Sequence, residues 1–94
     1  MRTLIWDNSF KRAFKRFVRK NPQLQDKIFD TLSILETNSF ASSLKSHKLS
    51  GKLEGLWACS VAYDCRIIFA FRENENTENQ AIVLIDIGTH DEVY

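Results

Sequence analysis

The chain has little of what marks several large classes of protein. Only two of its 94 residues are cysteines, and no run of about 18 apolar residues occurs, so we expect no segment that spans a membrane. The first residues, MRTLIWD, lack the apolar stretch of a secretion signal, which predicts a cytoplasmic protein. In that compartment Cys59 and Cys65 are expected to be reduced thiols of the core, because a zinc site needs more ligands at closer spacing.

The length leaves no room for a second domain. With 94 residues, no internal repeat and no interdomain linker, the sequence predicts one domain over residues 1–94. A chain this short buries roughly 60–65% of its unfolded surface, so it has one core and little spare material. Seven Phe, two Trp and two Tyr residues make such a core plausible.

The net charge of only +1 hides an asymmetry between the two halves of the chain. Residues 1–52 carry eleven Lys and Arg against four acidic residues, a balance of +7, whereas residues 53–94 carry two against eight, a balance of −6. A fold built from both halves is therefore expected to be a dipole. Its basic face is expected to bind a polyanion.

The N-terminal part is expected to form a strand followed by a helix. Residues 3–6 are β-prone and end at polar residues 7–9, any of which can cap a helix that runs to residue 20. Phe10, Phe14 and Phe17 fall on one face of that helix. Two rows of cations cover the rest of it: Lys11, Lys15 and Arg19, and beside them Arg12, Arg16 and Lys20.

A second helix is expected over about residues 22–36. Pro22 suits the first position of a helix, and Asn21 can cap it. The buried seam of this helix is predicted to consist of Leu24, Ile28, Leu32 and Leu35. Two helices joined so closely predict a helical hairpin.

After an irregular segment over residues 37–51, with a short helical turn near residues 40–44, the apolar period changes to two. This predicts a strand around 57–61, a turn at residues 63–64 and a strand over 65–72. Residues 73–80 read as a polar hairpin loop, and 81–87 as a central strand buried on both faces. The order β-α-α-β-β-β predicts an α+β fold, in which a helical hairpin packs on a mainly antiparallel four-stranded sheet.

Five residues between positions 47 and 94 suit one reaction, the cleavage of RNA without a metal or other cofactor. Such cleavage needs a base for the 2′-hydroxyl, an acid for the leaving 5′-oxygen and a cation for the phosphorane. Histidine, present here as His90 and His47, is a residue type that can serve as either base or acid, and the planar fork of Arg66 matches a phosphate. Asp64 and Tyr94 complete this set, although from spacing alone each residue also has an ordinary role in a turn or at a chain end.

Three segments carry a resemblance to a known family: residues 47–57 (HKLSGKLEGLW), residues 61–69 (VAYDCRIIF) and residues 84–94 (LIDIGTHDEVY). They resemble the RelE/ParE toxin superfamily, and among its branches the YafQ-like one. The expected order of elements agrees with that superfamily over the whole chain. The resemblance implies a single toxin domain with a RelE-like fold.

The resemblance also implies a function. Proteins of this kind are toxins of bacterial type II toxin–antitoxin systems, and the RelE and YafQ branches are endoribonucleases that cut mRNA in the ribosomal A site without a metal ion. The products carry a 2′,3′-cyclic or 3′-phosphate and a 5′-hydroxyl. The implied partners are a cognate antitoxin, mRNA and the ribosome, in a toxin–antitoxin hetero-oligomer.

Carried over residue by residue, the resemblance assigns roles to the same polar side chains. His90 matches the main catalytic histidine, the general acid, and Asp64 matches an essential aspartate. His47 matches an upstream histidine, either a base or a substrate-positioning group. Tyr94 matches an aromatic residue used for stacking or proton transfer, and Arg66 matches the phosphate-binding arginine of the RelE branch. RNA or ribosome contacts are expected from the helix cations and from Lys48 and Lys52.

One position departs from the family pattern and leaves alternatives open. The YafQ branch has a further histidine where this chain has Ser60, which cannot act as an acid or base at neutral pH. The general base is then His47, Asp64 or neither. Two other functions stay open, a ParE-like poison of DNA gyrase and a weakly active homologue that mainly binds its antitoxin. His90 argues against the gyrase poison, because that branch typically lacks a histidine there.

Overall fold

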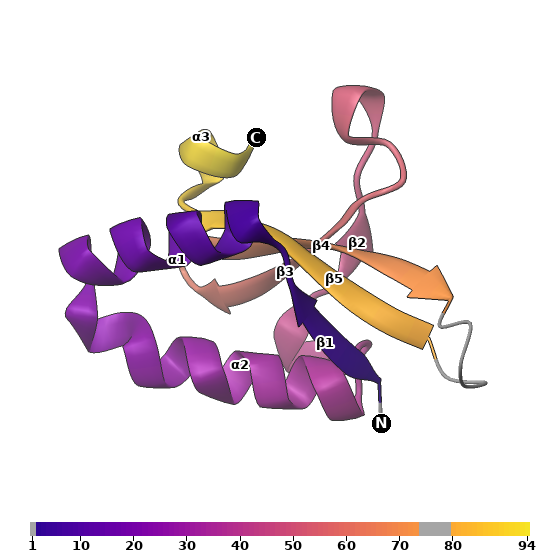
Figure 1. Ribbon diagram of the computed structural model, residues 1–94, viewed down its shortest axis with the longest axis horizontal. Helices are drawn as coiled ribbons and strands as arrows, with labels where there is room; N and C mark the ends of the chain where they lie inside the picture. Colours follow the sequence, from indigo (N-terminus) through magenta and orange to yellow (C-terminus); the bar gives the residue numbers. More distant parts are fainter. Residues whose placement is uncertain (1, 74–79) are drawn as a thin grey trace.

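The structure is a computed structural model that describes residues 2–73 and 80–94. A two-helix hairpin and a twisted sheet make up most of it (Figure 1). The elements are β1 (Thr3–Trp6), α1 (Asn8–Lys20), η1 (Pro22–Leu24), α2 (Gln25–Thr37), η2 (Ser42–Leu44), β2 (His47–Lys48), η3 (Gly51–Leu53), β3 (Trp57–Ala62), β4 (Cys65–Glu73), β5 (Gln80–Gly88) and α3 (His90–Val93). The predicted α+β arrangement is confirmed.

Helix α1 begins and turns inward as its sequence predicts. Of the three possible caps, Asp7 is the N-cap, and its carboxylate accepts hydrogen bonds from the backbone N–H and the hydroxyl of Ser9. These bonds lower the pKa of Asp7 below its ordinary value. Phe10 and Phe17 are buried and Phe14 is half-buried, whereas the two rows of cations are exposed.

The link between the helices differs from the prediction at Asn21. Its side chain does not cap the second helix; its Nδ2 instead donates to the carbonyl oxygen of Phe17, at the end of α1. Pro22 begins the single 3₁₀ turn η1, and regular α-helix starts only at Gln25. The predicted helix over residues 22–36 is thus a 3₁₀ turn followed by α2, with Ile28, Leu32 and Leu35 buried as expected.

The sheet has five strands in the order β1-β5-β4-β3-β2. Strand β5 is central, as predicted, because β1 pairs with it in parallel and β4 pairs with it antiparallel. The prediction of four strands missed β2, a two-residue strand at the edge, in which His47 pairs with Ala58 and Lys48 with Trp57. Residues 74–79, the bulk of the predicted polar loop, lie outside the described residues. The ends assigned to that loop, Glu73 and Gln80, instead pair with each other in β4 and β5.

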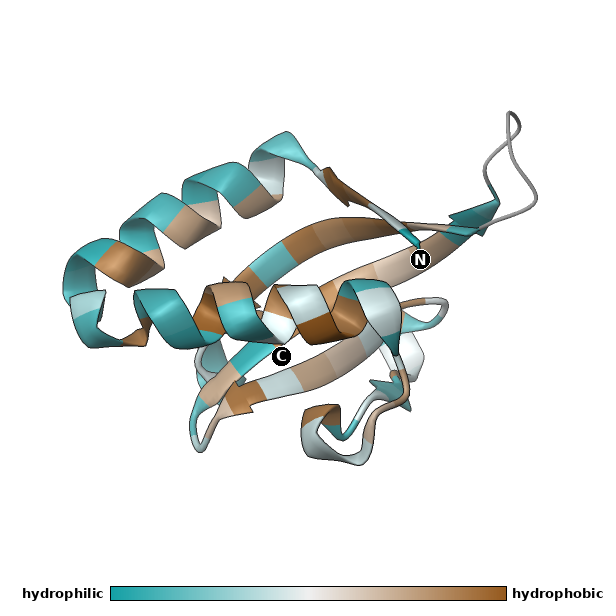
Figure 2. Ribbon diagram, turned by 90° about the horizontal axis from the view of Figure 1, so that it is seen from below, coloured by the Kyte–Doolittle hydropathy of each residue, from teal (hydrophilic) through white to brown (hydrophobic). Residues whose placement is uncertain are grey.

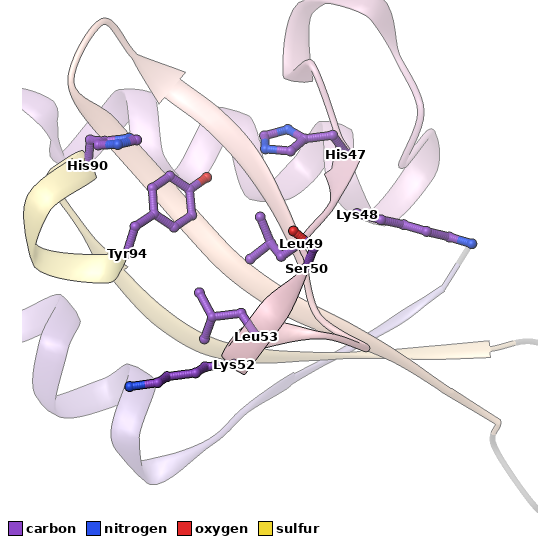
Figure 3. A pocket seen from close by; sticks show the side chains of 8 residues that line it. All are labelled: His47, Lys48, Leu49, Ser50, Lys52, Leu53, His90 and Tyr94. Carbon is purple, nitrogen blue, oxygen red and sulfur yellow. The ribbon is translucent and has the colours of Figure 1, made fainter.

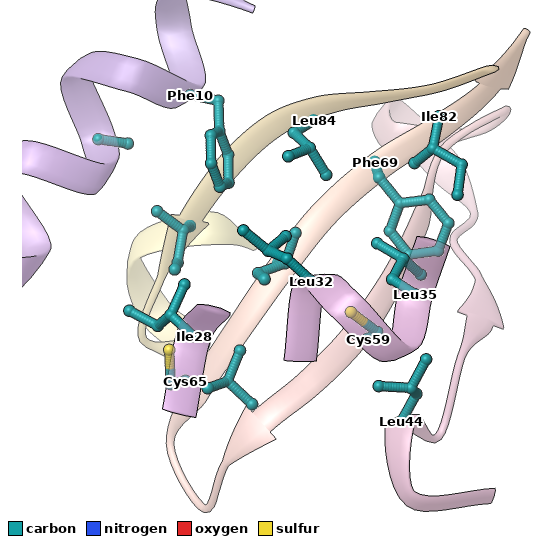
Figure 4. Close-up of a cluster of buried hydrophobic side chains, with 14 of the residues drawn as sticks. Phe10, Ile28, Leu32, Leu35, Leu44, Cys59, Cys65, Phe69, Ile82 and Leu84 are labelled. Carbon is teal, nitrogen blue, oxygen red and sulfur yellow. The ribbon is translucent and has the colours of Figure 1, made fainter. Parts of the chain in front are cut away.

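One face of the sheet carries the main core, covered by α1 and α2 (Figures 2 and 4). The alternation of the strands places Cys59, Val61, Cys65, Ile67 and Phe69 on this face, as the period of two predicts. Both cysteines are free thiols, as expected, and burial raises the pKa of Cys59 to about 12 and that of Cys65 to about 11. They are therefore uncharged packing residues at neutral pH.

The opposite face holds a much smaller apolar cluster of Ala58, Ile68 and Val93, with Leu49, Leu56 and Ile85 packed around it. Helix α3 and the segment that contains β2 and η3 stand on this side of the sheet in Figure 1. No helix in the described residues is long and apolar enough to cross a membrane.

Candidate functional site

The C-terminal residues form a capped helix rather than the simple strand end expected around His90. Thr89 is the N-cap of α3, and its hydroxyl accepts the backbone N–H of Glu92. The carboxylate of Glu92 accepts the backbone N–H of Thr89 in return, at 2.9 Å. This is a capping box, and its sequence signature, Thr followed three residues later by Glu, was visible at positions 89–92. His90 is the first residue of the helix.

The single turn of α3 brings two predicted site residues together. The rings of His90 and Tyr94 lie at a spacing of i, i+4 and meet edge to face, with centroids 4.5 Å apart. The ring of His90 is solvent-accessible, and the side chain of Tyr94 is 44% exposed. Both rings can therefore touch a bound molecule.

A pocket of about 540 Å³ separates α3 from the β2–η3 segment (Figure 3). Its lining consists of His47, Lys48, Leu49, Ser50, Lys52, Leu53, His90 and Tyr94. Five of the seven catalytic or basic residues predicted in residues 47–94 line this pocket, namely His47, Lys48, Lys52, His90 and Tyr94. Leu49, Ser50 and Leu53 were not predicted, and nothing in an irregular segment marks such residues as pocket walls.

His47 faces the pocket from β2, opposite Tyr94 (Figure 3). Its Nδ1 lies 3.0 Å from the carbonyl oxygen of Lys45, so the tautomer with a proton on Nδ1 donates to that oxygen. In this tautomer Nε2 is left as the proton acceptor. Lys48, the next residue of the strand, points away from the His90 and Tyr94 rings, and its ammonium lies 5.6 Å from the centre of the Trp57 ring.

The side chain of Asp64 contacts the site through the backbone of His90. One carboxylate oxygen, Oδ1, accepts a hydrogen bond from the backbone N–H of His90, at 3.1 Å, across 26 positions of sequence. Asp64 is not among the residues that line the pocket. The structure thus brings Asp64 to α3 itself.

Arg66 is engaged with the β3–β4 turn through its Nη1. Its Nη1 donates to the carbonyl oxygens of Ala62 at 2.9 Å, Tyr63 at 3.2 Å and Cys65 at 3.3 Å. The hydroxyl of Ser60 accepts a further bond from the same atom, at 3.4 Å. Ser60 therefore takes part in the support of Arg66.

Comparison with known proteins identifies the family of the chain. The sequence pattern of the family described as the bacterial toxin of type II toxin–antitoxin system, YafQ, matches residues 2–94. The chain belongs to the YafQ toxin family. It is thus a toxin of a type II toxin–antitoxin system, and the resemblance read from its motifs is confirmed. No curated protein sequence matches the chain.

Solved structures of such toxins share the fold. YafQ from E. coli strain BL21(DE3) matches with a TM-score of 0.78 and 18% identity over 100% of this chain and 99% of that one. A chain of the E. coli DinJ–YafQ toxin–antitoxin complex gives 0.76 and 19%, with 99% and 97% covered. A YoeB/ParE toxin from Agrobacterium tumefaciens gives 0.75 and 20%, with 94% and 98% covered. At these identities the likeness concerns the fold.

In this YafQ-family toxin, burial raises the pKa of Tyr94 above its ordinary value, and the nearby Arg66 guanidinium opposes that shift. Tyr94 is therefore a neutral phenol at neutral pH and can donate a hydrogen bond. The influence of Arg66 on Tyr94 also places its positive charge near the site. Within the described residues, no group of three or more His, Cys, Asp or Glu side chains could hold a metal ion.

Two cations of α1 act on acidic side chains near the toxin's site. The pKa of Glu92, on α3, is lowered mainly by the backbone N–H of Thr89, and Lys20 and Arg16 lower it further. Arg16 also attracts the carboxylate of Asp86, on β5. Arg16 and Lys20, which belong to the same row of α1, thus favour the ionised forms of acidic groups on α3 and β5.

Proposed function

We propose that this toxin is an endoribonuclease that cuts mRNA by attack of a 2′-hydroxyl on the adjacent phosphate, and that it does so on the ribosome. The observation that carries the proposal is the pocket in which His47, His90 and Tyr94 meet with Lys52 at its edge. The two imidazoles lie on opposite walls, so one can act as the general base and the other as the general acid. The proposed chemistry needs no cofactor, because side chains supply both proton transfers.

The proposed reaction has one bond-making and one bond-breaking event at phosphorus. Nε2 of His47 takes the proton of the 2′-hydroxyl, and the resulting alkoxide oxygen bonds to the phosphorus. The bond from phosphorus to the 5′-oxygen breaks, and His90 donates a proton to that oxygen. The products are a 2′,3′-cyclic phosphate, which water can open to a 3′-phosphate, and a 5′-hydroxyl. His47 as base follows from its tautomer, which leaves Nε2 as the acceptor.

Cations and an aromatic ring complete the proposed site. The ammonium of Lys52, on the pocket wall, balances the charge that builds on the phosphorane oxygens. The half-exposed ring of Tyr94 provides a surface on which a base stacks, and its neutral hydroxyl donates a hydrogen bond. Arg66 contributes a fixed positive charge from the turn that it supports rather than a direct phosphate contact.

The proposed partners follow from charge and from the relatives. The exposed cations of α1 favour the phosphates of mRNA and ribosomal RNA, since each contact releases counterions. The solved DinJ–YafQ complex pairs a YafQ toxin with its antitoxin. By analogy we expect a cognate antitoxin, with an acidic segment complementary to the basic surface, in a hetero-oligomer with this chain.

The decisive experiment compares the wild type with His90→Ala on an mRNA that is being translated in a cell-free extract. Loss of a general acid lowers the cleavage rate about 10²- to 10⁴-fold. Asp91→Ala, at the exposed neighbouring position of α3, is the matched control and is expected to cleave within about twofold of wild type. Primer extension locates the cuts, and end-group mapping should find 5′-hydroxyl ends.

Three outcomes would contradict the proposal in different ways. Equal cleavage by His90→Ala and wild type would remove His90 from the chemistry. Equal cleavage of the same mRNA with and without ribosomes would remove the ribosome from the account. Growth arrest without RNA cleavage, together with DNA breaks made by gyrase, would favour the ParE-like alternative.

A further inference from the structure

We infer that Asp64 is a positioning residue of the proposed ribonuclease. Its carboxylate accepts a hydrogen bond from the backbone N–H of His90, a role that an uncharged acceptor could also fill, and it transfers no proton. The inference rests on the proposed function only for its kinetic consequence. Its structural basis is the 3.1 Å bond from the His90 N–H to the Asp64 carboxylate, which joins the β3–β4 turn to the first residue of α3.

Helix α3 needs an external support because it is only four residues long. A single turn cannot stabilise itself, since its first N–H groups have no partner inside the helix. The capping box of Thr89 and Glu92 satisfies two of the N–H groups near its start. The N–H of His90 is satisfied by Asp64 instead, and this is the bond that reaches outside the local segment.

The apolar anchors of α3 are few. Val93 is the buried residue of the helix, in the small cluster with Ala58 and Ile68. Gly88 lets the helix approach the strand closely, because a Cβ at this position would lie 3.0 Å from the Cβ of Glu92. Val93 and Gly88 therefore fix the distance of α3 from the sheet. The bond from Asp64 fixes the end that carries His90.

The turn that holds Asp64 is itself supported by hydrogen bonds. Arg66 ties together the carbonyl oxygens of Ala62, Tyr63 and Cys65, the residues on both sides of Asp64. A support of this kind transmits little motion to the helix that it holds. Arg66, Asp64 and the backbone of His90 thus form a continuous connection from the sheet to the ring pair of His90 and Tyr94, whose centroids are 4.5 Å apart.

The geometry separates this role from that of a general base. Oδ1 of Asp64 is occupied by a backbone donor, and the residue lies outside the lining of the pocket. A backbone N–H can donate to an amide oxygen as well as to a carboxylate. Asp64→Asn keeps that oxygen and removes the charge and the basicity, whereas Asp64→Ala removes the acceptor.

The first arm of the test measures mRNA cleavage by the full-length toxin. For a positioning residue, Asp64→Asn should cleave within about threefold of wild type, and Asp64→Ala about 10- to 100-fold more slowly. The pH profile of Asp64→Asn should match that of wild type. Asp30→Ala, which removes an exposed carboxylate from α2, is the control and should match wild type. Equal loss in Asp64→Asn and Asp64→Ala, or a displaced acidic limb of the pH profile in Asp64→Asn, would overturn the inference.

The second arm does not depend on catalysis. Hydrogen exchange of the His90 amide, followed by NMR, should be at least about tenfold faster in Asp64→Ala than in wild type, and should be nearly unchanged in Asp64→Asn and Asp30→Ala. If the wild-type toxin cuts no RNA, the proposed function fails while this arm still decides whether Asp64 holds α3. Unchanged exchange in Asp64→Ala would overturn the inference by itself.

Discussion

The two faces of the sheet are stabilised in different ways. The face covered by α1 and α2 carries a continuous core of fifteen buried residues, Phe10 and Phe69 among them. The other face carries a cluster of only three buried apolar residues, and its short segments are held largely by hydrogen bonds to turns and caps. Apolar burial is non-directional, whereas a hydrogen bond sets both distance and angle. The helix-covered face therefore supplies stability, and the site face supplies position.

This division predicts that substitutions on the two faces separate stability from activity. A large cavity in the main core should unfold the toxin without a specific effect on the site. A change on the site face should disturb cleavage at a small cost in unfolding free energy. The predictions below test this separation from the largest expected effect to the smallest.

The largest effect is expected from Phe69→Ala on the helix-covered face. Phe69 is fully buried and packs edge to face on Phe71, so its loss leaves a large cavity. Such a change lowers the free energy of unfolding by about 3–5 kcal/mol, a large part of the total for a small domain. Urea denaturation followed by circular dichroism measures it. A loss below about 1 kcal/mol would show that this core is not the main source of stability.

The next effect concerns the two cationic rows of α1, one of which holds Arg16 and Lys20, whose charges act on Glu92 of α3. Replacement of Arg12, Arg16 and Lys20 by Gln should weaken binding of single-stranded RNA about tenfold and reduce the salt slope by roughly 2, because three phosphate contacts are lost. The matched control replaces Lys11, Lys15 and Arg19, and should weaken binding less. Fluorescence anisotropy over a series of NaCl concentrations measures both. Equal losses in the two triple variants would contradict the prediction that bound RNA contacts the row of Arg12, Arg16 and Lys20 more than the other row.

Much of the helix-covered face could be predicted from the sequence, because its signals are periodic. Alternation in residues 57–61 and 65–72 assigned the buried side chains of β3 and β4 correctly. Strand β2 escaped detection since two residues cannot show a period of two. Asn21 follows one helix and precedes another, so the sequence allowed both capping roles. The fold places its side chain on the carbonyl of Phe17.

The site face could be predicted in its residues but not in its contacts. The motifs named His47, His90 and Tyr94, which the pocket brings together. The partners of Asp64 and Arg66 could not be read from spacing, because they depend on how the β3–β4 turn meets a helix 26 positions away. Lys48 is a different case, since adjacent residues of a strand point to opposite faces. Because residues 37–51 are predicted to be irregular, the opposite orientations of His47 and Lys48 in β2 do not follow from the sequence.

A smaller effect on stability, with a larger effect on cleavage, is expected from Val93→Ala. Val93 belongs to the small cluster on the site face and anchors α3. Loss of two methyl groups lowers the free energy of unfolding by about 1 kcal/mol. The same change loosens α3, so cleavage should fall more than stability implies, by about fivefold or more. Urea denaturation and the mRNA assay measure the two quantities. Unaltered cleavage would contradict a positional role for this cluster.

The smallest effect is expected from Asp86→Asn. This substitution measures how much the partly buried charge of Asp86, on the site face, lowers the free energy of unfolding. Asp86 pairs with Ile68 in the sheet, and partial burial raises its pKa above 3.8 despite the backbone N–H of Ile87 and the charge of Arg16. Because the pKa of Asp86 is raised in the folded protein, the ionised carboxylate destabilises the fold at pH values above that folded pKa. The penalty disappears when the pH falls below the ordinary pKa of about 3.8, which applies to the unfolded chain. Asp86→Asn should therefore stabilise the toxin at pH 7 by less than about 1 kcal/mol, because solvent screens a half-exposed group. The gain should vanish at pH 3.5. Urea denaturation at both pH values measures it, and a loss of stability at pH 7 would show instead that the attraction of Arg16 outweighs the burial of the carboxylate.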